Sequence, residues 1–171
     1  MIPRNVVLTG FMGTGKTTIG RLLATELGFA YVDTDEVIEA RFGAISDIFA
    51  KGGEEEFRQL EKIVARELAS SAMFVIATGG RLMLDLNNAS VLGSTGRVFC
   101  LVASPEEIAR RLEGDESVRP LLGGSDPLAK IRDLLAEREE GYVRFEQVET
   151  DGRSPEDIVD DLLERLGVGS G

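Results

Sequence analysis

The chain has 171 residues, enough for one domain with a full hydrophobic core. Its formal net charge of −11 argues against nucleic acids and anionic membranes as partners. It contains no histidine, so any general base must be a carboxylate, and a histidine-ligated metal site is excluded.

Composition and hydropathy favour a cytoplasmic protein. The contents of 43% hydrophobic and 29% charged residues are typical of soluble globular domains, and no apolar run approaches the roughly 20 residues of a membrane span. The N-terminus runs directly into a predicted strand, so we expect no signal peptide. The single cysteine, Cys100, lies in an apolar run and is expected to be a buried, inert thiol.

The first predicted elements enclose a phosphate-binding loop. Residues 5–9 are typical of a buried parallel strand, and residues 16–27 carry apolar side chains at helical spacing. Between them, residues 10–17 (GFMGTGKT) match the pattern G-x-x-x-x-G-K-[ST] at every fixed position. Lys16 can reach the β- and γ-phosphates and Thr17 can ligate Mg²⁺. The sequence therefore predicts a nucleoside triphosphate site.

A second predicted strand, residues 29–33, leads into two carboxylates, Asp33 and Asp35. Because positions i and i+2 of a strand face the same side, both should project at the edge where open parallel sheets bind ligands. One could serve Mg²⁺ and the other could accept the proton of an attacking hydroxyl. The alternative is that Asp35 only caps the following helix.

The next helical region, residues 46–70, is interrupted by glycines at 52–53, so two helices or a bent one are expected. Arg58 has three acids within one helical turn, and they could form surface ion pairs of little consequence. Alternatively, an acidic neighbour orients Arg58 toward an anionic substrate. These acids are Glu54, Glu55 and Glu61.

A third strand, residues 73–78, precedes Gly79 and Gly80, which allow close approach of the backbone to a ligand but could also form a simple turn. A short helix over 84–92 and a fourth strand over 97–102 are predicted to follow. Ser104 and Pro105 mark the start of another helix.

The segment 113–125 is polar and rich in glycine around Arg119. A loop of this length favours a mobile lid that closes over phosphates, with Arg119 supplying positive charge. Residues 127–144 are predicted to be helical, with Arg138 on an otherwise apolar stripe. An edge strand over 145–149 and a final helix from Pro155 complete an alternating pattern, which predicts an α/β fold with a parallel sheet.

Six motifs occur in an order and spacing that are more specific than the phosphate loop alone. After that loop come DTD at 33–35, GEEEFR at 53–58, ATGG at 77–80, RPLL at 119–122 and R-x-x-x-Y at 138–142. On these motifs the chain resembles the shikimate kinase family along essentially its whole length.

The resemblance implies a single P-loop kinase domain over residues 1–171, with a three-layer α/β/α fold and a five-stranded parallel sheet of order 2-3-1-4-5. Residues 34–61 would bind the acceptor and residues 113–125 would form the lid. The implied reaction transfers the γ-phosphoryl group of ATP to the 3-hydroxyl of shikimate with Mg²⁺, in aromatic amino-acid biosynthesis. The implied protein is a cytoplasmic monomer.

The resemblance also implies site residues. Lys16, Asp35 and Arg119 would be catalytic, with Asp35 as the base. Arg58, Arg138, Gly79 and Gly80 would join Asp35 in binding the substrate, and Thr17 and Asp33 would serve Mg²⁺. The nucleotide would be bound by Gly13, Thr14, Gly15, Lys16, Thr17, Thr18, Arg111, Arg119, Arg153 and Pro155.

The chain departs from the family pattern near the acceptor. Arg81 replaces a third glycine, Glu140 and Gly141 replace Pro-Leu, and the segment 142–150 is slightly short. If residue 81 needs a positive φ, arginine there costs on the order of 1–3 kcal/mol. Three hypotheses stay open: a shikimate kinase with Arg81 turned outward, a kinase for another small hydroxylated acid or polyol, or a non-catalytic ATP-binding relative.

Overall fold

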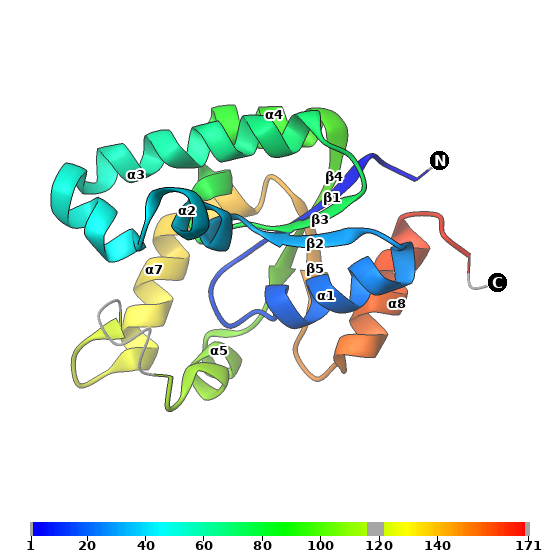
Figure 1. The fold of residues 1–171 in the computed structure, drawn as a ribbon. Helices are drawn as coiled ribbons and strands as arrows, with labels where there is room; N and C mark the ends of the chain where they lie inside the picture. The colour runs from blue at the N-terminus through cyan, green and yellow to red at the C-terminus, as the bar shows by residue number, and fades with distance from the viewer. Residues whose placement is uncertain (1, 116–121, 170–171) are drawn as a thin grey trace.

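The computed structural model describes residues 2–115 and 122–169. Within them, five parallel strands form one sheet in the order β2-β3-β1-β4-β5 (Figure 1). The predicted strand order is therefore confirmed. The strands are β1 (Asn5–Thr9), β2 (Ala30–Asp33), β3 (Phe74–Ala77), β4 (Gly96–Val102) and β5 (Glu146–Glu149).

Helices follow the strands in alternation. Serine caps begin α5 and α8, because Ser104 accepts a hydrogen bond from the backbone N–H of Glu107, and Ser154 does the same for Asp157. The helical elements are α1 (Lys16–Leu27), α2 (Thr34–Phe42), α3 (Ile45–Ser70), the 3₁₀ turn η1 (Leu82–Leu84), α4 (Leu86–Thr95), α5 (Pro105–Leu112), α7 (Pro127–Tyr142) and α8 (Pro155–Arg165).

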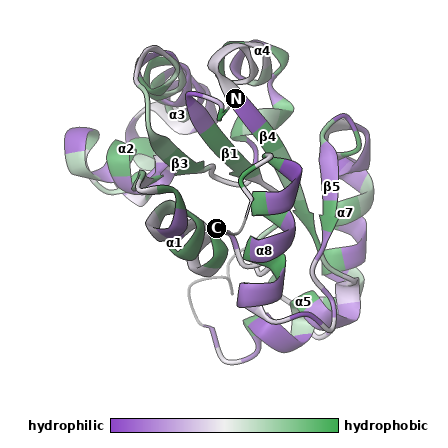
Figure 2. Cartoon of the chain, turned by 90° about the vertical axis from the view of Figure 1, so that its right-hand side faces the viewer, coloured by the Kyte–Doolittle hydropathy of each residue, from purple (hydrophilic) through white to green (hydrophobic). Residues whose placement is uncertain are grey.

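The sheet is covered by helices on both faces. Along β1, Val6 and Leu8 pack in one core with side chains of α1 and α8, whereas Val7 between them packs in another with side chains of α3 and α4. Hydrophobic residues accordingly gather between the layers (Figure 2). A third core joins Cys100, which is buried as predicted, to α5 and α7.

Two details refine the predicted elements. The helix α3 is bent at Gly53, where φ is 71° and ψ is −169°, as its glycine pair predicts. The helix predicted over 84–92 is wrong at its start: Asp85 accepts hydrogen bonds from the N–H groups of Asn87 and Asn88, so α4 begins after this cap. None of the helices in the described part of the chain could span a lipid bilayer.

Candidate active site

Three loops meet at one edge of the sheet. Because β2, β3 and β1 are neighbours, the Asp33 region after β2, the Gly79 region after β3 and the phosphate loop after β1 converge at the carboxyl ends of the strands. Asp35 packs on Gly79 and Arg138 lies against Gly80, so these two predicted site residues lie close together at this edge. Their charges and that of Asp33 also act on the pKa of Lys16.

The phosphate loop leaves the start of α1 free for an anion. Gly13 and Gly15 have φ angles of 76° and 99°, which favour glycine. Gly15 is the N-cap of α1, where no side chain caps the helix and no acid stands in the first turn. The buried Thr14 hydroxyl instead holds the loop by donating to the Phe11 carbonyl at 2.7 Å. Helix N–H groups are thus available to phosphate oxygens.

Lys16 lies within the loop. Its Nζ donates to the carbonyls of Gly10 and Phe11 at 2.5 and 3.0 Å. Burial lowers the pKa of Lys16 from 10.5 to about 8. Phosphate oxygens would favour the charged form, so the residue is suited to an anionic ligand.

Asp33 and Asp35 have different surroundings. The helix α2 already begins at Thr34, so Asp35 lies in a helical turn and the prediction that both carboxylates follow a strand alternation is wrong. The capping alternative for Asp35 is also wrong, because Asp33 is the cap. Its Oδ1 accepts from the N–H groups of Asp35 at 2.8 Å and Glu36 at 3.1 Å, which leaves Oδ2 for another ligand.

The Asp35 carboxylate packs directly on Gly79. A Cβ added at Gly79 would lie 2.4 Å from Oδ1 of Asp35, so any larger residue there would have to displace this carboxylate. Burial, followed by the negative charge of Asp33, raises the pKa of Asp35 from 3.8 to about 6. A carboxylate with this pKa can accept a proton near neutral pH.

Arg138 is buried without a full set of partners. The residue is 7% exposed, and its guanidinium lies 5.3 Å from the centre of the Phe11 ring. Within the described part of the chain, Nε and Nη1 have no hydrogen-bond partner. A Cβ added at Gly80 would lie 3.1 Å from Nη1. A buried cation with unused donors is costly unless an anion completes its surroundings.

Arg58 is oriented by a buried acid. Its Nη1 lies 2.5 Å from Oε1 of Glu61, which is 1% exposed, and its Nη2 lies 3.1 Å from Oε1 of the exposed Glu54. The interpretation as surface pairs therefore fits Glu54 but not Glu61. The prediction did not single out Glu61, although it lies four residues after the buried Phe57, on the same helical face.

A cavity of about 420 Å³ lies beside the phosphate loop. The structure brings most of the predicted nucleotide-binding residues to it. Among the further lining residues, three have polar side chains that the motifs did not indicate: Glu107, Arg110 and Thr150. Glu107 accepts from Nε of Arg111 at 3.0 Å. The predicted residues at this cavity are Thr14, Gly15, Thr18, Arg111, Arg153 and Pro155.

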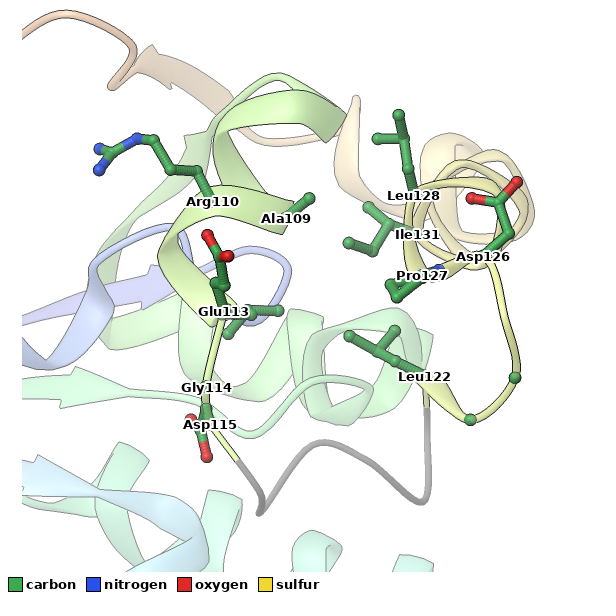
Figure 3. Close-up of a pocket in the computed structure, with 13 residues that line it drawn as sticks. Ala109, Arg110, Glu113, Gly114, Asp115, Leu122, Asp126, Pro127, Leu128 and Ile131 are labelled. Carbon is green, nitrogen blue, oxygen red and sulfur yellow. The ribbon is translucent and has the colours of Figure 1, made fainter.

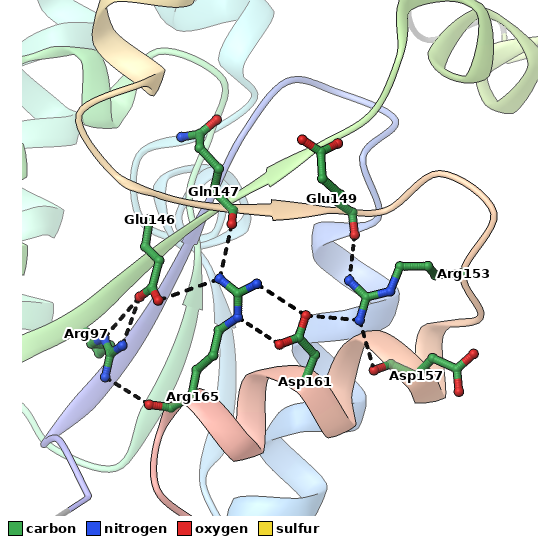
Figure 4. Close-up of polar contacts among 8 residues, drawn as sticks. All are labelled: Arg97, Glu146, Gln147, Glu149, Arg153, Asp157, Asp161 and Arg165. Atoms are coloured by element: carbon green, nitrogen blue, oxygen red, sulfur yellow. Dashed lines mark hydrogen bonds and ion pairs between the residues drawn. The ribbon is translucent and has the colours of Figure 1, made fainter.

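The two predicted arginines of this cavity, Arg111 and Arg153, are held by other groups of the chain. Nη1 of Arg111 donates to the Gly13 carbonyl at 3.1 Å. Arg153 donates to the Glu149 carbonyl at 2.8 Å and to Asp161 at 2.9 Å (Figure 4). Asp161 also accepts from Arg165, so a chain of ion pairs joins the cavity to the far end of α8.

Residues 116–121 of the predicted lid, with its arginine Arg119, lie outside the described residues. On either side of the gap, residues 113–115 and 122–124 border a cavity of about 670 Å³ between α5 and α7. Figure 3 shows Leu122 and Ile131 on one side of this cavity and Ala109 on the other.

The departures from the family pattern are accommodated. Arg81 is exposed and has a φ of −115°, so its backbone carries no left-handed strain. Gly141 lets α7 approach η1, since a Cβ there would lie 2.3 Å from Cδ2 of Leu84. The next residue, Tyr142, donates from its hydroxyl to the Gly80 carbonyl at 2.7 Å.

Comparison with known proteins agrees with this geometry. Residues 12–167 match the family described as "Shikimate kinase". The chain belongs to the shikimate kinase family. Shikimate kinase of Symbiobacterium thermophilum is 45% identical over 166 residues, covering 95% of each chain, and that of Thermoanaerobacter pseudethanolicus is 49% identical over 140 residues, covering 81% of each.

Solved structures of the family share the fold. Shikimate kinase from Acinetobacter baumannii, in complex with shikimate, superposes with a TM-score of 0.87 at 37% identity and covers 97% of this chain and 93% of its own. The chain is thus an enzyme of the shikimate kinase type, a phosphotransferase with an alcohol group as acceptor.

Proposed function

We propose that this shikimate kinase family member transfers the γ-phosphoryl group of ATP to the 3-hydroxyl of shikimate. The observation that carries the proposal is the buried guanidinium of Arg138, whose Nε and Nη1 have no partner within the described residues. It lies against Gly80, next to the glycine on which Asp35 packs. A small acid with a hydroxyl on the opposite side of its ring complements this pair.

Each group then has a role in positioning or proton transfer. Arg138 and Arg58 bind the substrate carboxylate, and two guanidinium groups allow charge-assisted, bidentate hydrogen bonds. Gly79 and Gly80 let the ring approach the backbone. Asp35 orients the acceptor hydroxyl and takes its proton at a carboxylate oxygen, which a pKa of about 6 permits.

The phosphate loop suits ATP. The free N–H groups at the start of α1 and the Lys16 ammonium would hold phosphate oxygens. Arg111, Arg153 and Pro155 line the cavity that would take the adenine ring of ATP. Mg²⁺ would neutralise phosphate charge, held by the Thr17 hydroxyl and Oδ2 of Asp33. Because no group of three or more potential ligands occurs among the described residues, phosphates and water would supply the remaining contacts.

A coupled ADP-release assay with Mg-ATP and shikimate tests this proposal on the unmodified protein and on Arg81→Gly. We expect turnover by both, with kcat/KM differing by less than about twofold, because an exposed side chain without backbone strain contributes little. Absence of turnover in both proteins, with ATP still bound, would exclude shikimate and direct the search to other hydroxy acids and polyols. Turnover only after Arg81→Gly would show that Arg81 blocks the acceptor.

A further inference from the structure

We propose that Thr34 and Tyr142 are positioning residues of the acceptor site. They hold the turn of Gly79 and Gly80 from its two sides and thereby set the separation of Asp35 from Arg138. This inference rests on the proposed function, because that separation matters for an acid whose carboxylate and reacting hydroxyl are bound at the two residues.

The first attachment comes from α2. Thr34 is fully buried, and its Oγ1 accepts a hydrogen bond from the N–H of Gly79 at 2.8 Å. Thr34 directly precedes Asp35, whose carboxylate packs on the same glycine. One short segment thus both supplies the base and fixes the backbone that the base rests on.

The second attachment comes from α7. The Tyr142 hydroxyl donates to the Gly80 carbonyl at 2.7 Å, and the side chain is buried. Tyr142 lies four residues after Arg138, so both side chains leave the same face of the helix. Arg138 in turn lies against Gly80. The hydroxyl therefore ties the arginine's own helix to the turn.

The helix reaches this position because Gly141 carries no side chain. A Cβ there would lie 2.3 Å from Cδ2 of Leu84, in the 3₁₀ turn that follows the glycines. In addition, Nη2 of Arg144 donates to the Leu84 carbonyl at 3.4 Å. The end of α7 thus packs on the segment 80–84. Thr34 and Tyr142 can position the site in this way without touching the substrate.

Removing either hydroxyl leaves a backbone group of the turn unpaired without changing the shape of the side chain much. In Thr34→Val, the Gly79 N–H loses its hydroxyl acceptor and faces a methyl group instead. In Tyr142→Phe, the Gly80 carbonyl loses its hydroxyl donor. A buried backbone group without a partner favours a shifted turn. A shifted turn changes the separation of Asp35 from Arg138, and this weakens the binding of an acid that must reach both residues.

Steady-state kinetics on Thr34→Val and Tyr142→Phe test the proposal, with Thr34→Ser as the conservative variant. Thr95→Val is the matched control, because Thr95 Oγ1 donates to the Ala69 carbonyl at 2.8 Å between α3 and α4. We expect the KM for shikimate to rise about fivefold or more in the first two variants, with the KM for ATP changed by less than about twofold. Thr34→Ser and Thr95→Val should resemble the unmodified protein.

A second readout does not depend on turnover. Amide exchange of residues 79–82, measured by NMR without ligand, should become about fivefold faster or more in Thr34→Val and unchanged in Thr95→Val. If exchange and both KM values stay unchanged, or if the two KM values rise together, the proposal is wrong. If the unmodified protein does not phosphorylate shikimate, the proposed function fails, and the exchange result still decides whether Thr34 holds the turn.

Discussion

Asp35 and Gly79 are in such close contact that the carboxylate occupies the space of a side chain at residue 79. An ideal Cβ on Gly79 would lie 2.4 Å from Oδ1 and 2.9 Å from Cγ of Asp35. The N–H of the same glycine is bound by Thr34. The glycine therefore serves close approach, and the candidate base is positioned by backbone that comes from another strand.

Gly79→Ala is expected to displace Asp35. The methyl group cannot fit without moving the carboxylate, so kcat should fall about tenfold or more while nucleotide affinity stays near that of the unmodified protein. The matched control is Gly93→Ala, because a Cβ at Gly93 meets nothing within 4 Å and alanine is favoured in a helix. An active Gly79→Ala protein would show that Asp35 does not need this contact.

Asp35→Asn tests the base itself. The amide cannot accept the proton of the hydroxyl, so kcat should fall about 100-fold or more, as is typical for loss of a positioned base. The Kd for ATP, measured by calorimetry, should change little because the phosphate loop is intact. Full activity in this variant would remove Asp35 from its catalytic role.

The same substitution should stabilise the protein at alkaline pH. Because the folded-state pKa of Asp35 is raised from 3.8 to about 6, ionising the residue costs stability progressively as pH rises through 6, and this cost is absent below about pH 4. Asparagine does not ionise. In denaturant unfolding, Asp35→Asn should gain about 1–3 kcal/mol at pH 8 and almost nothing at pH 4. An equal gain at both pH values would contradict the raised pKa.

Substitutions of Arg58 and Glu61 can separate the binding of shikimate from the stability of the protein. Arg58→Ala should raise the KM for shikimate about tenfold or more by removing a charged contact to the carboxylate. It should also destabilise the protein by about 3–5 kcal/mol, because the buried Glu61 loses its ion partner. Arg58→Ala/Glu61→Gln should recover stability but not the KM. Recovery of both would mean that Arg58 only neutralises Glu61.

Local patterns predicted much of the fold and site. The phosphate loop between a strand and a helix, the cap at Ser104 and the bend at Gly53 all depend on residues close in sequence. The resemblance predicted the strand order, which is confirmed. Arg138 was marked by its place on an apolar stripe, and it is buried.

Other features depend on where an element ends or on contacts between distant segments. The roles of Asp33 and Asp35 depend on where β2 ends. Because it ends at Asp33, this residue caps α2 and Asp35 lies within the helix. The Gly141–Leu84 contact joins residues 57 positions apart, and no local pattern marks it. Glu61 is buried because α3 packs against the sheet. Its ion pair with Arg58 therefore could not be distinguished from a surface pair by sequence alone.

In the proposed reaction, Arg138 and Asp35 bind the two ends of one acceptor. The most direct measurement is a crystal structure of the protein with shikimate and ADP. We expect the substrate carboxylate to lie within hydrogen-bond distance of Nε and Nη1 of Arg138, with the 3-hydroxyl at the Asp35 carboxylate. A carboxylate bound elsewhere, with Nε and Nη1 still unpartnered, would contradict it.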